Sequence, residues 1–151
     1  MLLSDLTTKL RLDLGDSEAA VLDESYLLRA LERVVVTVNQ DLGQSYLTTL
    51  TTIVPDPTPD HLEALLLQAQ ACVYQMMETQ AAGAFSFQSG DKKVDKTAQA
   101  KAYADLLAQA LKAYKEKIKA INPAYQDPAS DLFLPNFHQP TVFEQAVEVE
   151  A

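Results

Sequence analysis

Two long segments with helical periodicity constrain this chain more than any other feature of its sequence. The first begins at Pro59, whose missing N–H costs nothing at the first helical position, and Thr58 before it is a suitable cap. It should run for about 22 residues, until Ala81-Ala82-Gly83. The second begins near Asp95 and ends at Asn122-Pro123. Because only about 12 residues join the two, they are expected to pack as an antiparallel pair.

Apolar residues recur at intervals of three and four along both segments, which places them on one stripe of each helix. The first stripe contains Leu62, Leu65, Leu66, Ala69, Val73 and Met76, and the second contains Tyr103, Leu106, Leu107, Ala110, Tyr114, Ile118 and Ile121. Each helix is therefore expected to bury one face.

Two shorter helices are predicted before this pair. One runs from about Ser4, as a possible N-cap, to Leu14, and Gly15 ends it. The other begins at Asp23, a good N-cap, and continues towards Asp41, although its central Val34-Val35-Val36 would equally suit a strand. The shorter helices would complete a small bundle.

The fold class that follows is all-α: a bundle of about four helices, two of them long and antiparallel, with extended arms and a C-terminal strap. We expect residues 1–121 to form the bundle domain. Residues 45–54 are rich in threonine, β-branched and aromatic residues and predict an extended arm or edge strand. Residues 84–91 predict a short strand or hairpin at the end of the bundle.

Residues 122–151 form an extended tail in this prediction. Its three prolines forbid a regular helix through most of the segment, yet it is too apolar for a solvated tail. Either it folds back over its own bundle, or it docks on a neighbouring subunit or a partner protein. We favour the second alternative because the segment carries 5 acidic residues and no basic residue.

Charge and composition exclude several classes of protein. Hydrophobic residues make up 48% of the chain and charged residues 22%, which is typical of a soluble globular protein. No signal peptide or membrane helix is expected. The single cysteine, Cys72, excludes an internal disulfide and any multi-thiolate metal site. A net charge of -9 argues against general binding to nucleic-acid phosphates.

Residues with the potential for chemistry do not form a catalytic pattern. His61 and His138 have no ligand partner at helical spacing, and Cys72 has no indicated histidine partner, so it is expected to be a small buried residue. The 4 glycines form no phosphate-binding loop. We therefore expect that the protein is not an enzyme and has no cofactor, metal or catalytic residue. The alternative that stays open is a catalytic site made of carboxylates that are distant in sequence but close in the folded chain.

The second long helix is rich in lysine: residues 91–121 carry 8 basic and 4 acidic residues, against 4 basic and 12 acidic residues in 1–90. The lysines are spread over more than one face, are interleaved with acids and include no arginine to read base edges. A solvated face, or contact with an acidic neighbour, explains them better than nucleic-acid binding does.

The order of these parts resembles a known family. The N-terminal part looks like the head–tail connector (adaptor, or head completion) proteins of tailed bacteriophages. The residues that carry this resemblance are Leu6, Leu10, Arg11 and Leu14, then Asp16, then Leu22-Asp23-Glu24 leading to Leu27, Leu31 and Val34. A later region is also similar to the corresponding region of those proteins. It consists of Phe85-Ser86-Phe87-Gln88-Ser89-Gly90-Asp91-Lys92, followed by an alanine- and lysine-rich helix with Tyr103 and Tyr114. The resemblance covers about residues 3–120.

The resemblance implies a structural virion protein at the head–tail interface, present in the host cytoplasm during assembly. Its partners would be the portal protein, a neck or tail protein, and other copies of itself in a ring, commonly of about a dozen in that family. DNA would pass through the channel without specific binding, and an acidic lumen would repel it. The alternatives are a DNA-packaging or regulatory helical protein that binds nucleic acid, and a generic helical interaction module.

The residues predicted to contact a partner or a neighbouring subunit are the apolar ones of the extended segments. They are Tyr46, Leu47, Leu50, Ile53, Phe85, Phe87, Leu132, Phe133, Leu134, Phe137 and Phe143.

Overall fold

The computed structural model describes residues 1–16, 18–19, 21–83, 88–89, 92–93 and 97–127 of the chain. Most of this part is helical: α1 (Leu3–Leu14), α2 (Glu24–Leu42), α3 (Pro59–Gly83) and α4 (Thr97–Ile121). Two antiparallel strand pairs complete it: β1 (Leu47–Thr48) with β2 (Ile53–Val54), and β3 (Gln88–Ser89) with β4 (Lys92–Lys93). The expected all-α bundle of four helices is confirmed.

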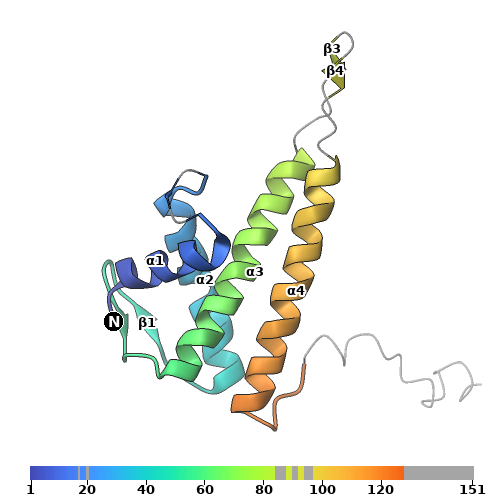
Figure 1. Cartoon of the computed structure of the whole chain (residues 1–151). Helices are drawn as coiled ribbons and strands as arrows, with labels where there is room; N and C mark the ends of the chain where they lie inside the picture. The colour runs from blue at the N-terminus through green and yellow to red at the C-terminus, as the bar shows by residue number, and fades with distance from the viewer. Residues whose placement is uncertain (17, 20, 84–87, 90–91, 94–96, 128–151) are drawn as a thin grey trace, which may run out of the picture.

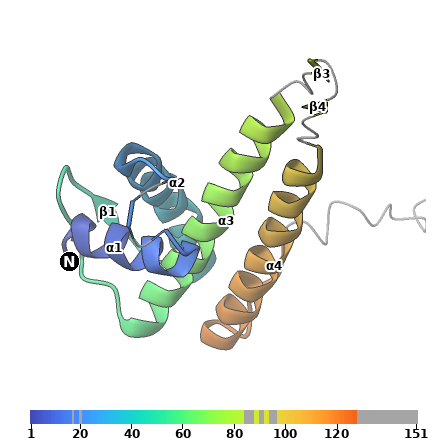
Figure 2. The same cartoon turned by 45° about the horizontal axis from the view of Figure 1, so that its top comes forward.

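The two long helices lie side by side and antiparallel, as Figures 1 and 2 show. α3 begins at Pro59 as predicted. Just before it, the Thr58 carbonyl accepts a hydrogen bond from Leu62 N at 2.8 Å, and the Thr58 hydroxyl accepts one from His61 N at 3.4 Å. The paired helices therefore start and end close to the positions expected from proline, glycine and capping residues.

The core of the bundle is built around α3, which packs against α1, α2 and α4. Because neighbours surround it on several sides, its buried residues go beyond a single stripe and include Ala64 and Ala71 as well as Leu65. The largest side chains that are fully buried are Leu6, Leu10, Leu27, Leu31, Val38, Ile53, Leu65, Val73 and Ile118. α1, α2 and the first strand pair thus cover one part of the long helical pair.

The boundaries of the shorter helices are set partly by tertiary pairing. α1 begins at Leu3, so the expected N-cap at Ser4 is wrong. Leu2 occupies the cap position with an extended backbone because it pairs with Thr52 across an antiparallel bridge. Gly15 ends α1 in the left-handed conformation (φ 74°), which glycine adopts at little cost.

α2 shows the predicted start, since Asp23 caps it and accepts a hydrogen bond from Glu24 N. Its valine-rich centre is helical, and Val34 and Val35 are buried. Hydrophobic burial on a helical stripe therefore overrides the strand preference of adjacent valines.

The apolar stripe of α4 is buried only towards its C-terminal end. Ala110, Tyr114 and Ile118 are buried as expected, but Leu106 is exposed and Tyr103 is only half-buried. α4 packs extensively on α3 and only slightly on α2. The N-terminal part of the stripe consequently lacks a second helix to cover it.

The short strand pair β3–β4 lies beyond the ends of α3 and α4 (Figure 1), where the sequence predicts a strand or hairpin. Phe85 and Phe87 of this segment lie outside the described residues. The described part of the tail ends at Asp127, after Tyr125, which packs against the core. The remaining tail, with Leu132, Phe133, Leu134, Phe137, His138 and Phe143, is likewise outside the described residues.

Candidate functional site

The segment 45–54 forms a hairpin whose two faces differ in exposure. Tyr46 and Ile53, two of the predicted contact residues, are buried in the core of this chain, so their side chains have little surface left for a partner. Leu47 and Leu50 point outward and are 70% and 98% exposed. Side chains alternate between the two faces of a strand, and the hydrophobic interior of the bundle accepts one of those faces.

The hairpin is held by the first residues of the chain. Leu3 N donates to the Thr51 carbonyl at 2.8 Å, and Ile53 N donates to the Met1 carbonyl at 2.9 Å. Leu2 pairs with Thr52 between these two bonds. The N-terminal segment therefore lies along β2 and satisfies the backbone groups of its outer edge.

A single side chain of α2 fixes the entry into the hairpin. The Asn39 amide donates to the Tyr46 carbonyl and accepts from Tyr46 N, both at 2.8 Å. The Tyr46 hydroxyl in turn lies 2.6 Å from Nδ1 of His61 on α3, and burial raises the pKa of Tyr46. These contacts tie the start of the hairpin to both helices.

The turn of the hairpin is also ordered by internal bonds. Thr49 N donates to the Thr52 carbonyl at 2.8 Å, and the two threonine hydroxyls are 2.7 Å apart. At this turn Leu50 has almost no contact with its own chain. Hydrogen bonds and burial thus hold the inner face of the hairpin, and its outer face presents apolar side chains to solvent.

We call the exposed apolar side chains of this region the hairpin patch. It consists of Leu2, Leu47, Leu50 and Val54, each at least half exposed. Single exposed leucines are ordinary, but four exposed apolar side chains on one paired segment form a candidate interaction surface. Leu2 is not among the predicted contact residues, because the sequence does not show that the N-terminal segment joins the hairpin. Val54 is not among them either, because the composition of 45–54 does not show which residues face outward.

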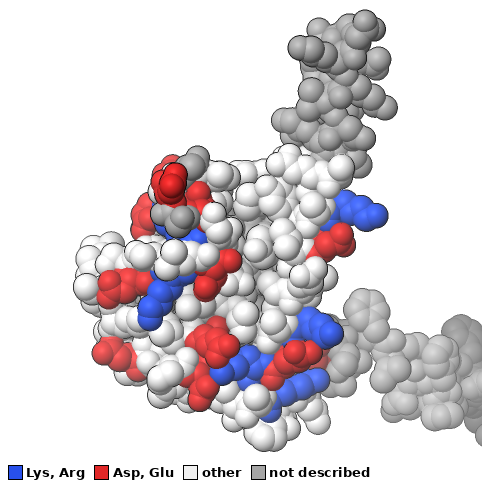
Figure 3. All heavy atoms as spheres, in the orientation of Figure 1, with Lys and Arg blue, Asp and Glu red and all other residues white. Residues whose placement is uncertain are grey.

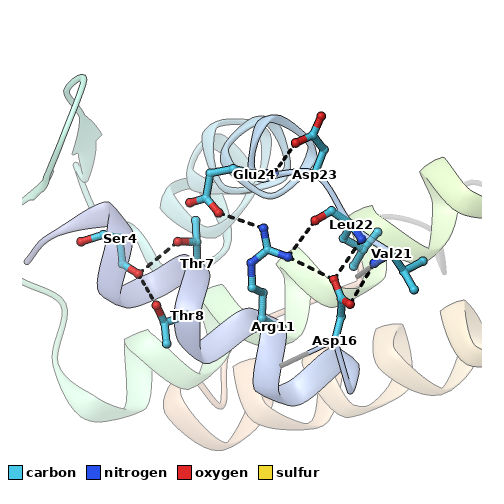
Figure 4. A network of polar contacts seen from close by, with 9 residues as sticks. All are labelled: Ser4, Thr7, Thr8, Arg11, Asp16, Val21, Leu22, Asp23 and Glu24. Atoms are coloured by element: carbon cyan, nitrogen blue, oxygen red, sulfur yellow. Dashed lines mark hydrogen bonds and ion pairs between the residues drawn. The ribbon is translucent and has the colours of Figure 1, made fainter. Parts of the chain in front are cut away.

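A second feature is a polar network that closes the connection between α1 and α2 (Figure 4). The Arg11 guanidinium bonds Asp16 Oδ2 at 3.0 Å, the Leu22 carbonyl at 2.7 Å and Glu24 Oε2 at 3.0 Å. Asp16 Oδ1 accepts from Val21 N at 3.1 Å, and its Oδ2 accepts from Leu22 N at 2.9 Å. Arg11 and Asp16 thus fold the connection onto α1.

The ion pair at the centre of this network is nearly buried, since the Arg11 and Asp16 side chains are 12% and 7% exposed. Glu24 at its outer end is half exposed, and a hydrogen bond from Thr7 and the nearby Arg11 hold the pKa of Glu24 below its usual value. Sequence patterns alone do not predict this pairing. An arginine in the last turn of a leucine-rich helix, followed by Asp16 just after Gly15, is the signal that could have revealed it.

A third feature is a groove of about 290 Å³ between the α1–α2 connection and the parts of α3 and α4 nearest β3–β4. We call it the apolar groove; its walls include Val21, Tyr26, Met76, Met77, Gln80 and Tyr103. The Tyr26 hydroxyl accepts a 2.6 Å bond from the Gln80 amide, which joins α2 to α3 across one side. No charged residue lines this groove among those the structure describes.

Two lysines of α4, Lys115 and Lys117, form close ion pairs within the described part of the chain. Lys117 lies 2.8 Å from Asp60 Oδ1 and 2.5 Å from Glu63 Oε2 in the first turns of α3. Lys115 pairs with Asp127 at 2.5 Å, just after α4 ends. Figure 3 shows basic side chains close to acidic ones over the lower part of the molecule. Such pairs leave fewer free cations for a phosphate backbone.

Groups that could carry other chemistry are dispersed. Across residues 1–127, apart from the gaps given above, no three His, Cys, Asp or Glu side chains are placed to hold a metal ion. Cys72 is half-buried, and burial raises the pKa of its thiol, which keeps it protonated and weakly nucleophilic. Within the same residues, no helix has the length and apolar character to cross a membrane.

Comparisons of the chain with models of known protein families, with curated proteins and with solved structures found no match.

Proposed function

We propose that this chain is a structural protein of a tailed-bacteriophage virion, a head-to-tail connector (adaptor) subunit. Copies of it would form a ring under the portal protein, extend the DNA channel and present a surface to a neck or tail protein. In this role the chain needs interaction surfaces and a stable bundle and performs no catalysis.

The observation that carries the proposal is the hairpin patch. Its backbone is fixed by Met1–Leu3, Asn39 and the turn at Thr49, while Leu47 and Leu50 stay largely in water. Exposing leucines on a rigid segment is costly in solubility unless they are covered by another subunit. A subunit that assembles only in the virion would keep such a surface uncovered until then.

The residues on which the resemblance rests support the same proposal. Leu6, Leu10 and Leu27 are buried in the core, and Arg11, Asp16 and Glu24 belong to one network. The leucines and charges of this pattern therefore belong to one structural unit, the packing of α1 on α2.

Charge favours a channel-forming subunit over a nucleic-acid-binding protein. The chain carries 21 acidic and 12 basic residues, and Lys115 and Lys117 already have acidic partners. A ring of such subunits would repel DNA and let it pass. The alternative, a DNA-packaging or regulatory protein, requires a surface with several unpaired cations. The ion pairs of Lys115 and Lys117 lower the number of such cations.

Sedimentation of the purified protein with and without cognate portal rings tests the proposal. We expect a monomer or small oligomer alone and a closed ring on the portal, and electron microscopy of the complex would show it as an added layer. A protein that stays unbound in the presence of its cognate portal would refute the assignment.

A further inference from the structure

We propose that the hairpin patch of one copy docks in the apolar groove of the next copy, so that the subunits join head to tail. This inference rests on the proposed function and specifies the subunit interface that a ring requires. It joins two different surfaces of the chain, the patch around Leu50 and the groove beside Val21 and Met77.

The two surfaces cannot meet within one molecule. The hairpin precedes Pro59 at one end of α3, whereas Met77 lies towards the other end, so the helix axis rises by roughly 27 Å between them. The hairpin is also fixed to the bundle by Asn39 and by its pairing with the N-terminal segment. A contact between patch and groove must therefore join separate copies.

The chemistry of the two surfaces matches. Residues 45–55 contain no charged side chain, and neither does the groove lining in the described part of the chain. Figure 3 shows an area without charged side chains over the part of α3 nearest β3–β4, bordered on the α4 side by one basic and one acidic side chain. Copies that each carry a net charge of -9 repel one another, and such uncharged surfaces are where they approach at the lowest electrostatic cost.

The groove also has a suitable size and lining. Its volume of about 290 Å³ exceeds the cavity of about 150 Å³ that accommodates benzene in an engineered core, so a leucine side chain fits. Met76 and Met77 can adjust their unbranched side chains to the shape of an incoming group. Gln80 and Tyr103 supply polar edges for the hairpin backbone.

Symmetry distinguishes this contact from a simple pairing of patches. Two hairpin patches packed on each other would form an isologous dimer, which closes after two copies. A patch in a groove is a heterologous contact, which repeats from copy to copy and generates a ring when the rotation closes. A connector ring requires the second kind.

Cross-linking of the full-length protein tests the pairing directly. In a Cys72→Ala background, the variants Val21→Cys and Leu50→Cys would be treated with a short bismaleimide, alone and mixed. We expect each single variant to stay monomeric, an equal mixture to give dimers that contain one of each, and the double variant to give a ladder. Homodimers of Leu50→Cys, or no product from the mixture on assembled portal complexes, would overturn the inference.

Charge substitutions provide an independent readout. Leu50→Lys and Val21→Lys should each weaken self-association about tenfold or more, because a lysine would be buried without a partner. Val36→Lys is the matched control, since Val36 is an exposed apolar residue of α2 that borders neither surface, and it should assemble normally. All three should melt like the parent. Rings that form normally with Leu50→Lys would refute this interface and leave the proposed function standing, whereas a parent protein that never binds the portal refutes the function itself.

Discussion

The hydroxyl of Tyr114 donates a 2.6 Å hydrogen bond to the Asp41 carboxylate, and this contact ties α4 to the C-terminal end of α2. Asn122, just after α4, adds a 3.5 Å bond to the Asp41 carbonyl. Because α4 packs mainly on α3 and only slightly on α2, these two bonds add a direct polar link between α4 and α2.

Tyr114→Phe should destabilise the protein by about 1.5–3 kcal/mol at neutral pH, the usual contribution of a hydrogen bond to a charged group. Denaturant unfolding of the variant would measure this loss. Tyr103→Phe is the matched control, because Tyr103 is only half-buried and its hydroxyl meets Gln99 alone at 3.4 Å.

The same tyrosine predicts alkaline sensitivity. Burial, and then the bond to Asp41, raise the pKa of Tyr114 far above its ordinary value. A raised pKa in the folded state means that stability is fully present below about pH 10, the unfolded value, and is lost as the pH rises above it. The free energy of unfolding should therefore fall steeply above pH 10 in the parent and less steeply in Tyr114→Phe. Equal slopes would contradict this origin.

Arg11→Met should destabilise the protein by about 3–5 kcal/mol, because it leaves the Asp16 carboxylate nearly buried without its cation. Lys9→Met, on the exposed side of the same helix, should change stability by less than about 0.5 kcal/mol. Thermal melts of both variants would test the difference, and similar midpoints would show that the network contributes little.

Asn39→Ala should loosen the hairpin, since both backbone groups of Tyr46 lose their partner, at a cost of about 1–3 kcal/mol. Hydrogen exchange should accelerate at Tyr46 and Ile53 more than in the core of α3. Gln40→Ala, at an exposed neighbouring position, is the control and should leave these rates unchanged.

Deletion of residues 128–151 should leave the melting temperature unchanged and abolish assembly on the portal, if the tail docks on a neighbour as its sequence suggests. A segment that packed on its own bundle would behave differently, because a loss of about 1 kcal/mol shifts the midpoint of such a domain by a few degrees. A destabilised truncation that still assembles would reverse this prediction.

The free protein should not bind duplex DNA measurably at about 0.15 M salt, where association needs several unpaired cations. Fluorescence anisotropy with a labelled duplex would measure it. Steeply salt-dependent binding in the micromolar range or tighter would favour the packaging or regulatory alternative and direct attention to Lys112, Lys115 and Lys119.

The helices could be predicted because their signals are local. Pro59 and Asp23 determine helix starts through backbone chemistry, and the spacing of apolar residues determines which face is buried. The start of α1 could not be predicted, because Leu2 stays extended through its pairing with Thr52, about fifty residues away in sequence. Tertiary pairing of this kind leaves no local pattern.

The interaction surface could be predicted only in part for a related reason. The segment 45–54 was identified from its composition, but composition does not show which alternate residues face inward. The Tyr46 side chain lies inward, where it is buried and its hydroxyl meets His61, whereas Leu50 lies at the turn and is exposed. The groove depends on three helices meeting, so no single segment of the sequence indicates it.

The contact between Asp41 and Tyr114 lies towards the C-terminal end of α4, so a small tilt about this joint moves the other end of the helix much further. From Tyr114 to the start of α4 at Thr97 the helix runs for roughly 26 Å, so a tilt of about 5° at this joint would move that end of α4 by about 2 Å. A contact made near Tyr103 would thus change the angle between α4 and α2 slightly. In the proposed ring, the spacing between neighbouring subunits could adjust to the portal in this way while every helix stays folded.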